Sequence, residues 1–219
     1  MPKFRSVVLD VDSTLSGIEG IDWLAARRSP EIGERVARLT AEAMAGKRAI
    51  EEVYRARLEL VRPTSEELAE LAEAYWQEGA PDARDTIARL TAAGVRIEIV
   101  TSGLREAVAP FAARLGLAES RVHAVPITFD ARGGYSSFDS SASLCVQGGK
   151  RVVAESLDLE KPVLAVGDGV TDAEIRPVAD EFAVFTGFIR REPVVAIADH
   201  VVESFAELEQ LVLGTGESA

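Results

Sequence analysis

Apolar residues occur in short runs, separated by longer amphipathic stretches. Four runs have the length and β-branched content of buried strands: Val7–Asp10, Val95–Val100, Val163–Val166 and Phe182–Phe185. Between them, Asp82–Ala93 and Glu106–Leu115 carry large apolar residues at helical spacing. Strands that alternate with helices predict an α/β fold, with a doubly wound, mostly parallel sheet (a Rossmann-like core) covered by helices on both faces.

The stretch from residue 16 to residue 79 breaks this alternation, because it shows only helical patterns. The expected helices are Ile18–Arg27, Pro30–Ala45, Ala49–Leu60 and Ser65–Glu78. Pro63 separates the last two, and Thr64 or Ser65 suits the N-cap that follows. We therefore expect a helical-bundle cap at 16–79, inserted into an α/β core formed by 1–15 and 80–219.

A second, smaller departure spans Val122–Phe138. Val125, Ile127 and Phe129 alternate with polar residues or proline, and Gly133-Gly134 then turns the chain. Alternation followed by paired glycines predicts a β-hairpin over this segment.

The composition limits which partners and which cellular compartment are expected. The 219 residues are 47% hydrophobic and 27% charged, which is typical of a soluble globular protein. The net charge of −12, without a basic stripe, argues against a nucleic-acid partner. Cys145 is the only cysteine, and neither a signal-peptide pattern nor a membrane-length apolar run is present. We expect a cytoplasmic protein without membrane contact, and the sequence does not indicate its oligomeric state.

Candidate chemistry begins where the first predicted strand ends. Asp10 and Asp12 follow the apolar run Val7–Leu9. Because a strand repeats every two residues, both carboxylates can leave its end toward the same side. Two such charges repel each other unless a cation, a proton or a ligand compensates them. The pair suits a metal-assisted site in which one carboxylate attacks and the other transfers a proton.

Three further polar groups stand where this architecture would bring them to the same place. Thr101-Ser102-Gly103 ends the second strand, and its hydroxyls and backbone N–H groups can cradle an anion. In Gly148-Gly149-Lys150 the glycines allow close approach to a ligand, and the lysine adds a positive charge. Gly167–Asp172 carries two more carboxylates, Asp168 and Asp172. Ligands of such sheets bind beyond the carboxyl ends of the strands, so we expect these groups to converge.

Each of these signals, taken alone, has a plain structural explanation as a loop, a solvated lysine or a turn. Their joint occurrence, in order and next to apolar strands, favours an active site. Other reactive side chains do not fit one. His123 and His200 match no metal-ligand spacing, and Cys145 has no evident activating partner. The Arg190-Arg191 pair is too small to bind nucleic acid.

The four motifs resemble those of the haloacid dehalogenase superfamily of phosphohydrolases. They are Asp10–Thr14, Thr101–Gly103, Lys150 and Gly167–Asp172. Along nearly its whole length the chain is similar to one family of that superfamily, the phosphoserine phosphatases. The cap carries this likeness in Glu19–Asp22, in Ala43-Met44-Ala45-Gly46 and in Arg57-Leu58.

The resemblance implies a Mg²⁺-dependent phosphatase. Asp10 would be the nucleophile that forms an aspartyl-phosphate, and Asp12 would protonate the leaving oxygen and then deprotonate water. Magnesium would be held by the carboxylates of Asp10 and Asp168 and the backbone carbonyl of Asp12, with Asp172 in support.

The resemblance also implies how the substrate is bound. Ser102, Gly103 and Lys150 would hold phosphate oxygens. Glu19 would pair with a substrate ammonium group and Arg57 with a substrate carboxylate, while Met44 and Thr171 complete the substrate-binding set. The implied substrate is O-phosphoserine, a small phosphorylated metabolite that is cleaved to L-serine and phosphate.

Two departures from the family pattern leave alternatives open. Ile50 stands where the family usually carries phenylalanine, and Leu104 stands where it usually carries a second glycine. Both can reshape the amino-acid pocket. The alternatives are hydrolysis of another small phosphorylated metabolite and phosphoryl transfer to an acceptor such as homoserine. A non-catalytic binding module is a remote alternative, because all the expected reactive side chains are present.

Overall fold

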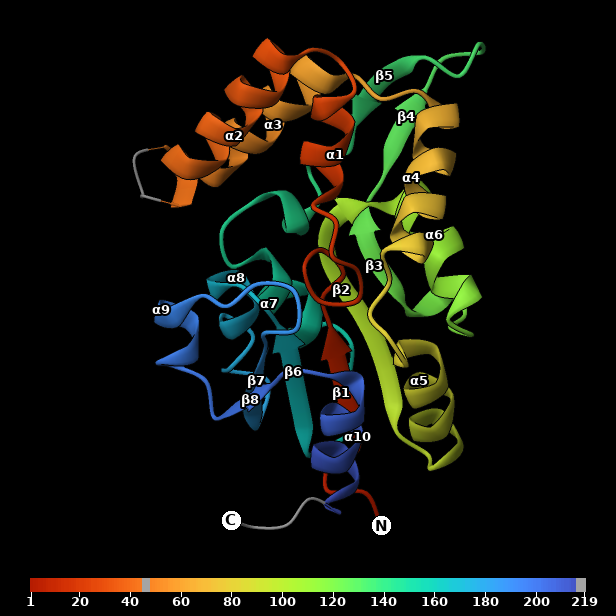
Figure 1. Ribbon diagram of the computed structural model, residues 1–219, viewed down its shortest axis with the longest axis vertical. Coiled ribbons are helices and arrows are strands. Elements are labelled where there is room, and N and C mark those ends of the chain that lie inside the picture. The colour runs from red at the N-terminus through yellow and green to blue at the C-terminus, as the bar shows by residue number, and fades with distance from the viewer. Residues whose placement is uncertain (45–47, 216–219) are drawn as a thin grey trace.

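In the computed structural model, which describes residues 1–44 and 48–215, six strands form one parallel sheet. They are β1 (Ser6–Leu9), β2 (Arg96–Leu104), β3 (Val122–Val125), β6 (Val163–Gly167), β7 (Glu181–Phe185) and β8 (His200–Val202). Their order in the sheet is β3-β2-β1-β6-β7-β8 (Figure 1). The predicted parallel α/β sheet is confirmed, although the sequence pattern did not indicate its two edge strands, β3 and β8.

The central strands align the segments that carry the acidic motifs. Every residue of β1 and β6 is buried, as their unbroken apolar runs require. Leu9, the last residue of β1, is in register with Ile99 of β2 and Val166 of β6. The carboxyl ends of β1 and β6 are therefore adjacent, and the polar residues that follow them lie side by side.

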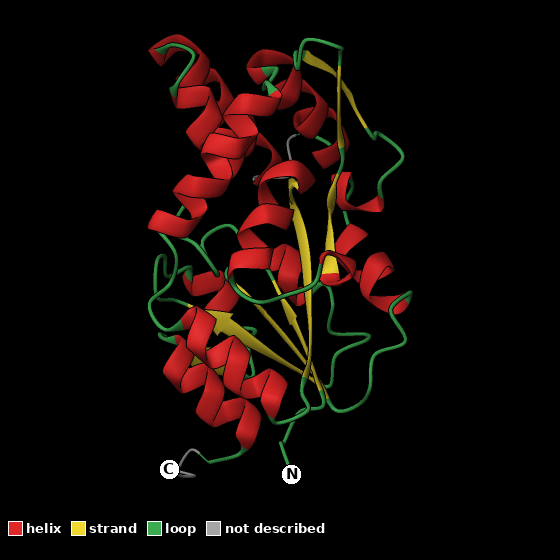
Figure 2. Cartoon of the chain, turned by 90° about the vertical axis from the view of Figure 1, so that its right-hand side faces the viewer, coloured by secondary structure: helices red, strands yellow, loops and turns green. Residues whose placement is uncertain are grey.

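Helices lie on both sides of this sheet (Figure 2). The helices of the described core are α5 (Ala83–Ala92), α6 (Arg105–Arg114), α7 (Gly149–Glu155), α8 (Val170–Ala173), α9 (Glu192–Val195) and α10 (Phe205–Leu213), with short 3₁₀ turns at Glu119–Arg121 and Ser143–Cys145. α5 and α10 pack against each other. Fully buried Phe111, Phe182 and Phe205 help to fill the interior between the helices and the sheet.

The segment from 16 to 79 forms helices where the pattern predicts them. They are α1 (Gly20–Ala26), α2 (Pro30–Met44), α3 (Ile50–Val61) and α4 (Ser65–Gln77). α4 begins with a capping box: the Glu67 N–H donates to Thr64 Oγ1, and the Thr64 N–H donates to Glu67 Oε2. α1–α3 lie beyond the carboxyl ends of the central strands, whereas α4 packs against α6 of the core (Figure 1). We call residues 16–79 the cap. Their action as a separate domain stays a prediction.

The predicted hairpin is confirmed for β4 (Ile127–Phe129) and β5 (Tyr135–Phe138), which pair antiparallel. It was wrong for Val122–Val125, which pair with β2 in the main sheet. The hairpin reaches the cap: the Ser65 N–H donates to the Gly133 carbonyl at 2.9 Å, and the Tyr54 and Phe138 ring centroids are 5.6 Å apart. The cap is thus anchored to the core away from the acidic motifs as well as near them.

A buried carboxylate on β2 lies beside the edge strand β3. Glu98 is 1% exposed and accepts hydrogen bonds from Arg96 Nε at 2.8 Å, Arg121 Nη1 at 2.5 Å and His123 Nε2 at 3.0 Å. Burial acts to raise the pKa of Glu98, but the bonds from His123, Arg121 and Arg96 prevail and lower it to about 2. His123 therefore has a structural partner at the edge of the sheet.

Replacing Glu98 by Gln is expected to cost about 2 kcal/mol of unfolding free energy at pH 7. It removes the buried negative charge that the partly exposed Arg96 and Arg121 share, and it brings an amide N–H group among their donors. The folded-state pKa of Glu98 is depressed, so its stabilisation is complete above the unfolded pKa of about 4.3 and is lost as pH falls toward 2. The difference between wild type and Glu98→Gln in urea unfolding should therefore shrink below about pH 4.5. Glu119→Gln, which removes an exposed partner of Arg105, is the control and should change little. A difference that is constant with pH would contradict this account.

Candidate active site

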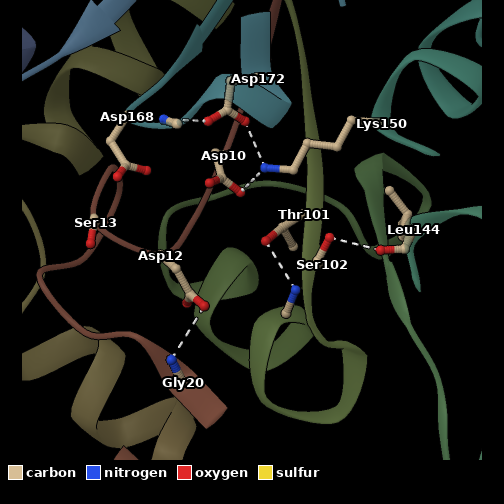
Figure 3. A network of polar contacts seen from close by, with 12 residues as sticks. Asp10, Asp12, Ser13, Gly20, Thr101, Ser102, Leu144, Lys150, Asp168 and Asp172 are labelled. Atoms are coloured by element: carbon tan, nitrogen blue, oxygen red, sulfur yellow. Dashed lines mark hydrogen bonds and ion pairs between the residues drawn. The ribbon is translucent and has the colours of Figure 1, made fainter. Parts of the chain in front are cut away.

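Three aspartates and one lysine meet at the carboxyl ends of β1 and β6 (Figure 3). Asp10 follows β1, Asp168 follows β6, and Asp172 belongs to α8. One carboxylate oxygen from each aspartate lies within 4.8 Å of the other two, and all three side chains are buried. The structure thus brings together residues that are more than 150 positions apart in the sequence, as the motif order predicts.

Glycine makes room for the third carboxylate. A Cβ at Gly167 would lie 2.0 Å from Asp172 Cγ, so any larger residue there would push the carboxyl group out of place. The Gly169 N–H donates to Asp172 Oδ2 at 2.9 Å and holds the group in the turn. The Gly-Asp-Gly motif is therefore a positioning device for Asp172 as well as the source of Asp168.

Lys150 enters the cluster from the first turn of α7. Its Nζ lies 2.8 Å from Asp10 Oδ1 as an ion pair and donates to Asp172 Oδ1 at 2.6 Å (Figure 3). A Cβ at Gly149 would lie 1.8 Å from the Ser143 carbonyl oxygen, so α7 can approach this close only with glycine at 149. The sequence suggested that Gly149 allows a ligand to approach. In the structure it allows the Ser143 carbonyl to approach, and this close packing places Lys150 beside the aspartates.

The cluster holds more negative than positive charge. Burial and repulsion from Asp10 raise the pKa of Asp168, although Arg191 opposes this with an ion pair of 2.9 Å between Nη2 and Asp168 Oδ2. Burial raises the pKa of Asp172 to about 7, although the Lys150 charge opposes it. Three buried carboxylates beside two cations have an electrostatic reason to accept a further positive charge.

The donor set fits a hard divalent cation. Its side-chain donors are carboxylate oxygens that are close enough to share one ion, which is the chemistry that Mg²⁺ prefers. Apart from its ion pair with Lys150, Asp10 Oδ1 accepts no hydrogen bond of good geometry from the described residues, so this buried oxygen can also contact a ligand. The cluster contains three of the four residues predicted to bind the metal, Asp10, Asp168 and Asp172, and that they bind an ion stays a prediction.

Asp12 is placed differently from the three clustered aspartates. Its Oδ1 accepts a hydrogen bond from Tyr75 Oη at 2.6 Å, and its Oδ2 accepts one from the Gly20 N–H at 3.2 Å. Burial and the nearby Glu19 carboxylate raise the pKa of Asp12 well above its usual range, against the opposing effect of the Tyr75 bond. Asp12 is thus held as a separate carboxyl group that faces the cap.

The predicted phosphate cradle is engaged with the chain itself. Ser102 Oγ donates to the Leu144 carbonyl at 2.7 Å, and the Gly103 N–H donates to Thr101 Oγ1 at 3.1 Å (Figure 3). β2 continues through these residues to Leu104, four residues further than the apolar run Val95–Val100 predicts. An anion bound here would have to exchange these partners for its own oxygens.

The cap residues of the predicted substrate site lie around a second set of charges. Glu19 Oε1 accepts from Ser13 Oγ at 2.8 Å and lies 3.7 Å from Arg191 Nη2. Arg57 pairs through Nη2 with Asp22, and its Nε is buried without a hydrogen-bond partner among the described residues.

Thr171 and Met44 stay predictions as substrate-binding residues. Thr171 is half-buried on α8 next to Asp172. Met44 ends α2, and its side chain lies outside the described part of the structure, as do Ala45 and Gly46.

The sequence did not single out two residues that contact this site. Arg191, dismissed with Arg190 as an isolated basic pair, lies against Asp168. Tyr75 lies on the buried face of α4. A buried tyrosine hydroxyl needs a hydrogen-bond partner, and this need was the signal in the sequence that could have found it. For Arg191, the available signal was that the motifs carry more acidic than basic residues, so a further cation was to be expected near them.

Cys145 and His200, which the sequence did not indicate as catalytic, take no part in the acidic cluster. Burial raises the pKa of the Cys145 thiol to about 12, which disfavours the reactive thiolate. His200 pairs with Glu181 at the far edge of the sheet. Among the described helices, none combines the length and the apolar character that a bilayer crossing requires.

Comparisons of sequence and of structure with known proteins identify similar phosphatases. The profile of the haloacid dehalogenase-like hydrolases matches residues 7–175, which include all the motifs above. The phosphoserine phosphatase of Bos taurus is 32% identical over 206 residues, covering 93% of this chain and 91% of the bovine protein. That of Drosophila melanogaster is 32% identical over 209 residues, covering 92% and 76%. A crystal structure of a phosphoserine phosphohydrolase-like protein from Francisella tularensis has a TM-score of 0.84 at 25% identity, covering 95% of this chain and 99% of that one.

Proposed function

Because this chain belongs to the haloacid dehalogenase-like hydrolases and is a phosphatase, we propose that it cleaves O-phosphoserine to L-serine and phosphate. We propose further that it does so with Mg²⁺ and through an aspartyl-phosphate on Asp10. The observation that carries this proposal is the buried meeting of Asp10, Asp168, Asp172 and Lys150, with Asp12 held apart on hydrogen bonds of its own.

The two carboxyl groups of the first motif take different roles in this reaction. An Asp10 oxygen attacks phosphorus, the bond from phosphorus to the serine oxygen breaks, and Asp12 gives its proton to that oxygen. Water then attacks the phosphorus of the aspartyl-phosphate while Asp12 takes a proton from it. The bond from phosphorus to the Asp10 oxygen breaks, which frees the Asp10 carboxylate and phosphate. The raised pKa of Asp12 supports its starting this cycle protonated, as an acid must.

The cations of the site neutralise charge during this transfer. Lys150, within ion-pair distance of Asp10, is placed to offset both the nucleophile and the oxygens of the transferred group. Mg²⁺ held by Asp10, Asp168 and Asp172, with the Asp12 carbonyl, would supply further positive charge that lets an anionic nucleophile approach an anionic phosphate. Arg191 orients Asp168 through its ion pair.

The choice of an amino-acid substrate is supported by the charges of the cap. The buried Arg57 Nε has no acceptor among the described residues, and an unsatisfied buried donor of this kind is costly unless a ligand satisfies it. A substrate carboxylate would do so beside Asp22. Glu19, whose Oε1 accepts from Ser13 Oγ in the turn after β1, carries the carboxylate that would receive the ammonium group of the same small molecule.

Phosphate release over a panel of phosphomonoesters tests the substrate. The panel holds O-phosphoserine, phosphoethanolamine, which lacks the carboxylate, 3-phosphoglycerate, which lacks the ammonium, and a sugar phosphate. We expect the highest kcat/KM for O-phosphoserine. A sugar phosphate that ranks first would reject the serine assignment and keep the phosphatase. Phosphohomoserine formed when homoserine is added would identify transfer in place of hydrolysis.

Arg57→Leu is expected to raise KM for O-phosphoserine about 10- to 100-fold, which corresponds to losing one charge-assisted pair. Phosphoethanolamine has no carboxylate, so its kcat/KM should change less than about threefold. Arg55→Leu, an exposed arginine two residues earlier on α3, is the matched control and should leave both substrates unaffected. An equal loss on both substrates would mean that Arg57 supports the fold of the cap and does not read the carboxylate.

A further inference from the structure

Among the residues that the structure describes, the hydroxyl of Tyr75 has one polar partner, the carboxyl group of Asp12. Tyr75 is fully buried in the last turns of α4, and its ring stacks on Phe111, with centroids 5.6 Å apart and planes at 30°. Its Oη donates to Asp12 Oδ1 at 2.6 Å. Because the ring is clamped by packing and closed off from solvent, the hydroxyl cannot turn away to water, and the direction of this bond is fixed by the fold.

Gly20 shapes the same contact from the other side of the cap. Its N–H donates to Asp12 Oδ2 at 3.2 Å, so each oxygen of Asp12 has one donor. A Cβ at residue 20 would lie 2.2 Å from Tyr75 Oη, so the hydroxyl can reach Asp12 only because residue 20 is glycine. The two donors come from the chain entering the cap and from the helix leaving it.

These two connections are themselves tied together. The Gly17 N–H donates to the Glu78 carbonyl at 2.9 Å, and Ser16 Oγ donates to the same carbonyl oxygen at 3.2 Å. The base of the cap, which consists of residues 16–20 and 75–79, is therefore one hydrogen-bonded unit that ends on Asp12. This gives the cap a direct means of setting the position of that carboxyl group.

We propose that Tyr75 is a positioning residue for Asp12, which holds its carboxyl group in line for proton transfer to and from the leaving oxygen. The role rests on the proposed function, because it requires Asp12 to give its proton as the bond from phosphorus to oxygen breaks. Tyr75 itself neither gains nor loses a proton in this cycle. Its hydroxyl and the Gly20 N–H fix the two oxygens of Asp12 in space.

The role has a signature that depends on the leaving group. Departure of a serine alkoxide needs protonation, whereas 4-nitrophenolate is stable enough to leave without it, so only the first reaction depends on a well-placed acid. Tyr75→Phe keeps the ring stack and removes the donor. We expect kcat/KM to fall about 10- to 100-fold for O-phosphoserine and less than about threefold for 4-nitrophenyl phosphate.

Two further variants separate positioning from packing. Tyr54→Phe removes the hydroxyl of another buried cap tyrosine, which donates to the Ser102 carbonyl at 2.8 Å and does not bond Asp12. It should lower kcat/KM for the two substrates by the same factor. Gly20→Ala keeps Tyr75 but displaces its hydroxyl, so it should reproduce the difference between the substrates, and it tests the role independently if Tyr75→Phe does not fold.

The outcomes are distinct. Equal losses on both substrates in Tyr75→Phe and in Gly20→Ala, with an active wild type, would overturn the positioning role and leave the proposed function intact. A wild-type protein that hydrolyses neither substrate with Mg²⁺ would overturn the proposed function, and the positioning role with it. A selective loss on O-phosphoserine in either variant supports the role.

Discussion

Asp10→Asn is expected to lower turnover of every phosphomonoester by at least about 10⁴-fold, because an amide oxygen cannot form the covalent intermediate. Asparagine has the size and shape of aspartate, and the backbone bond from the Asp10 N–H to the Val166 carbonyl, 3.0 Å long, is unaffected. The substitution also removes one of three mutually repelling buried charges. Steady-state phosphate release with Mg²⁺ measures the loss.

The same variant should fold as well as the wild type. Thermal unfolding of the metal-free proteins provides the control, and relief of repulsion among Asp10, Asp168 and Asp172 predicts an unchanged or higher Tm. Loss of activity together with a collapsed Tm would show a damaged fold and not a missing nucleophile. Retention of more than about 1% of turnover would exclude Asp10 as the attacking group.

Removal of divalent cations with EDTA is expected to abolish hydrolysis, and added Mg²⁺ is expected to restore it, because the nucleophile and the phosphate are both anions. Mg²⁺ should also stabilise the folded protein in the absence of substrate, by about 2.7 kcal/mol at 100 times its Kd. The Tm measured with and without Mg²⁺ is a readout that does not depend on catalysis.

Asp168→Asn locates the binding site of the ion. It should raise the Tm of the metal-free protein, since it removes a buried charge, and reduce the Tm gain produced by Mg²⁺. Asp85→Asn, at an exposed position on α5, should leave that gain unchanged. An undiminished gain in Asp168→Asn would place the ion somewhere other than the cluster of Asp10, Asp168 and Asp172.

Most elements of the fold could be predicted because their patterns are local. β1 and β6 are unbroken apolar runs, and the four cap helices carry periodic apolar residues over enough turns to be recognised. β3 and β8 could not be found in this way. They are four and three residues long, they lie at the sheet edges, and each includes a histidine that is only half-buried. Such short segments become strands because a neighbouring strand offers them hydrogen bonds.

The residues of the candidate active site also fall into two groups, those that the sequence could name and those that it could not. Asp10, Asp12, Lys150, Asp168 and Asp172 could be named in advance, because each stands in a motif next to a strand end or a helix start and parallel strands end at one edge. The contact of Tyr75 with Asp12 spans 63 positions, and that of Arg191 with Asp168 spans 23. No pattern near either residue names its partner, since packing of α4 on α6 and the path of the chain after β7 create both contacts.

Residue type and spacing were thus sufficient for the class of chemistry, which needs paired carboxylates, a lysine and glycines in a set order. Only the three-dimensional packing showed that Gly149 makes room for the Ser143 carbonyl and that Arg191 pairs with Asp168. It also showed that Tyr75 and Gly20 donate hydrogen bonds to Asp12. The reason is physical: a strand or helix follows from interactions within a few residues, whereas the charge and direction of a buried side chain depend on every group packed around it.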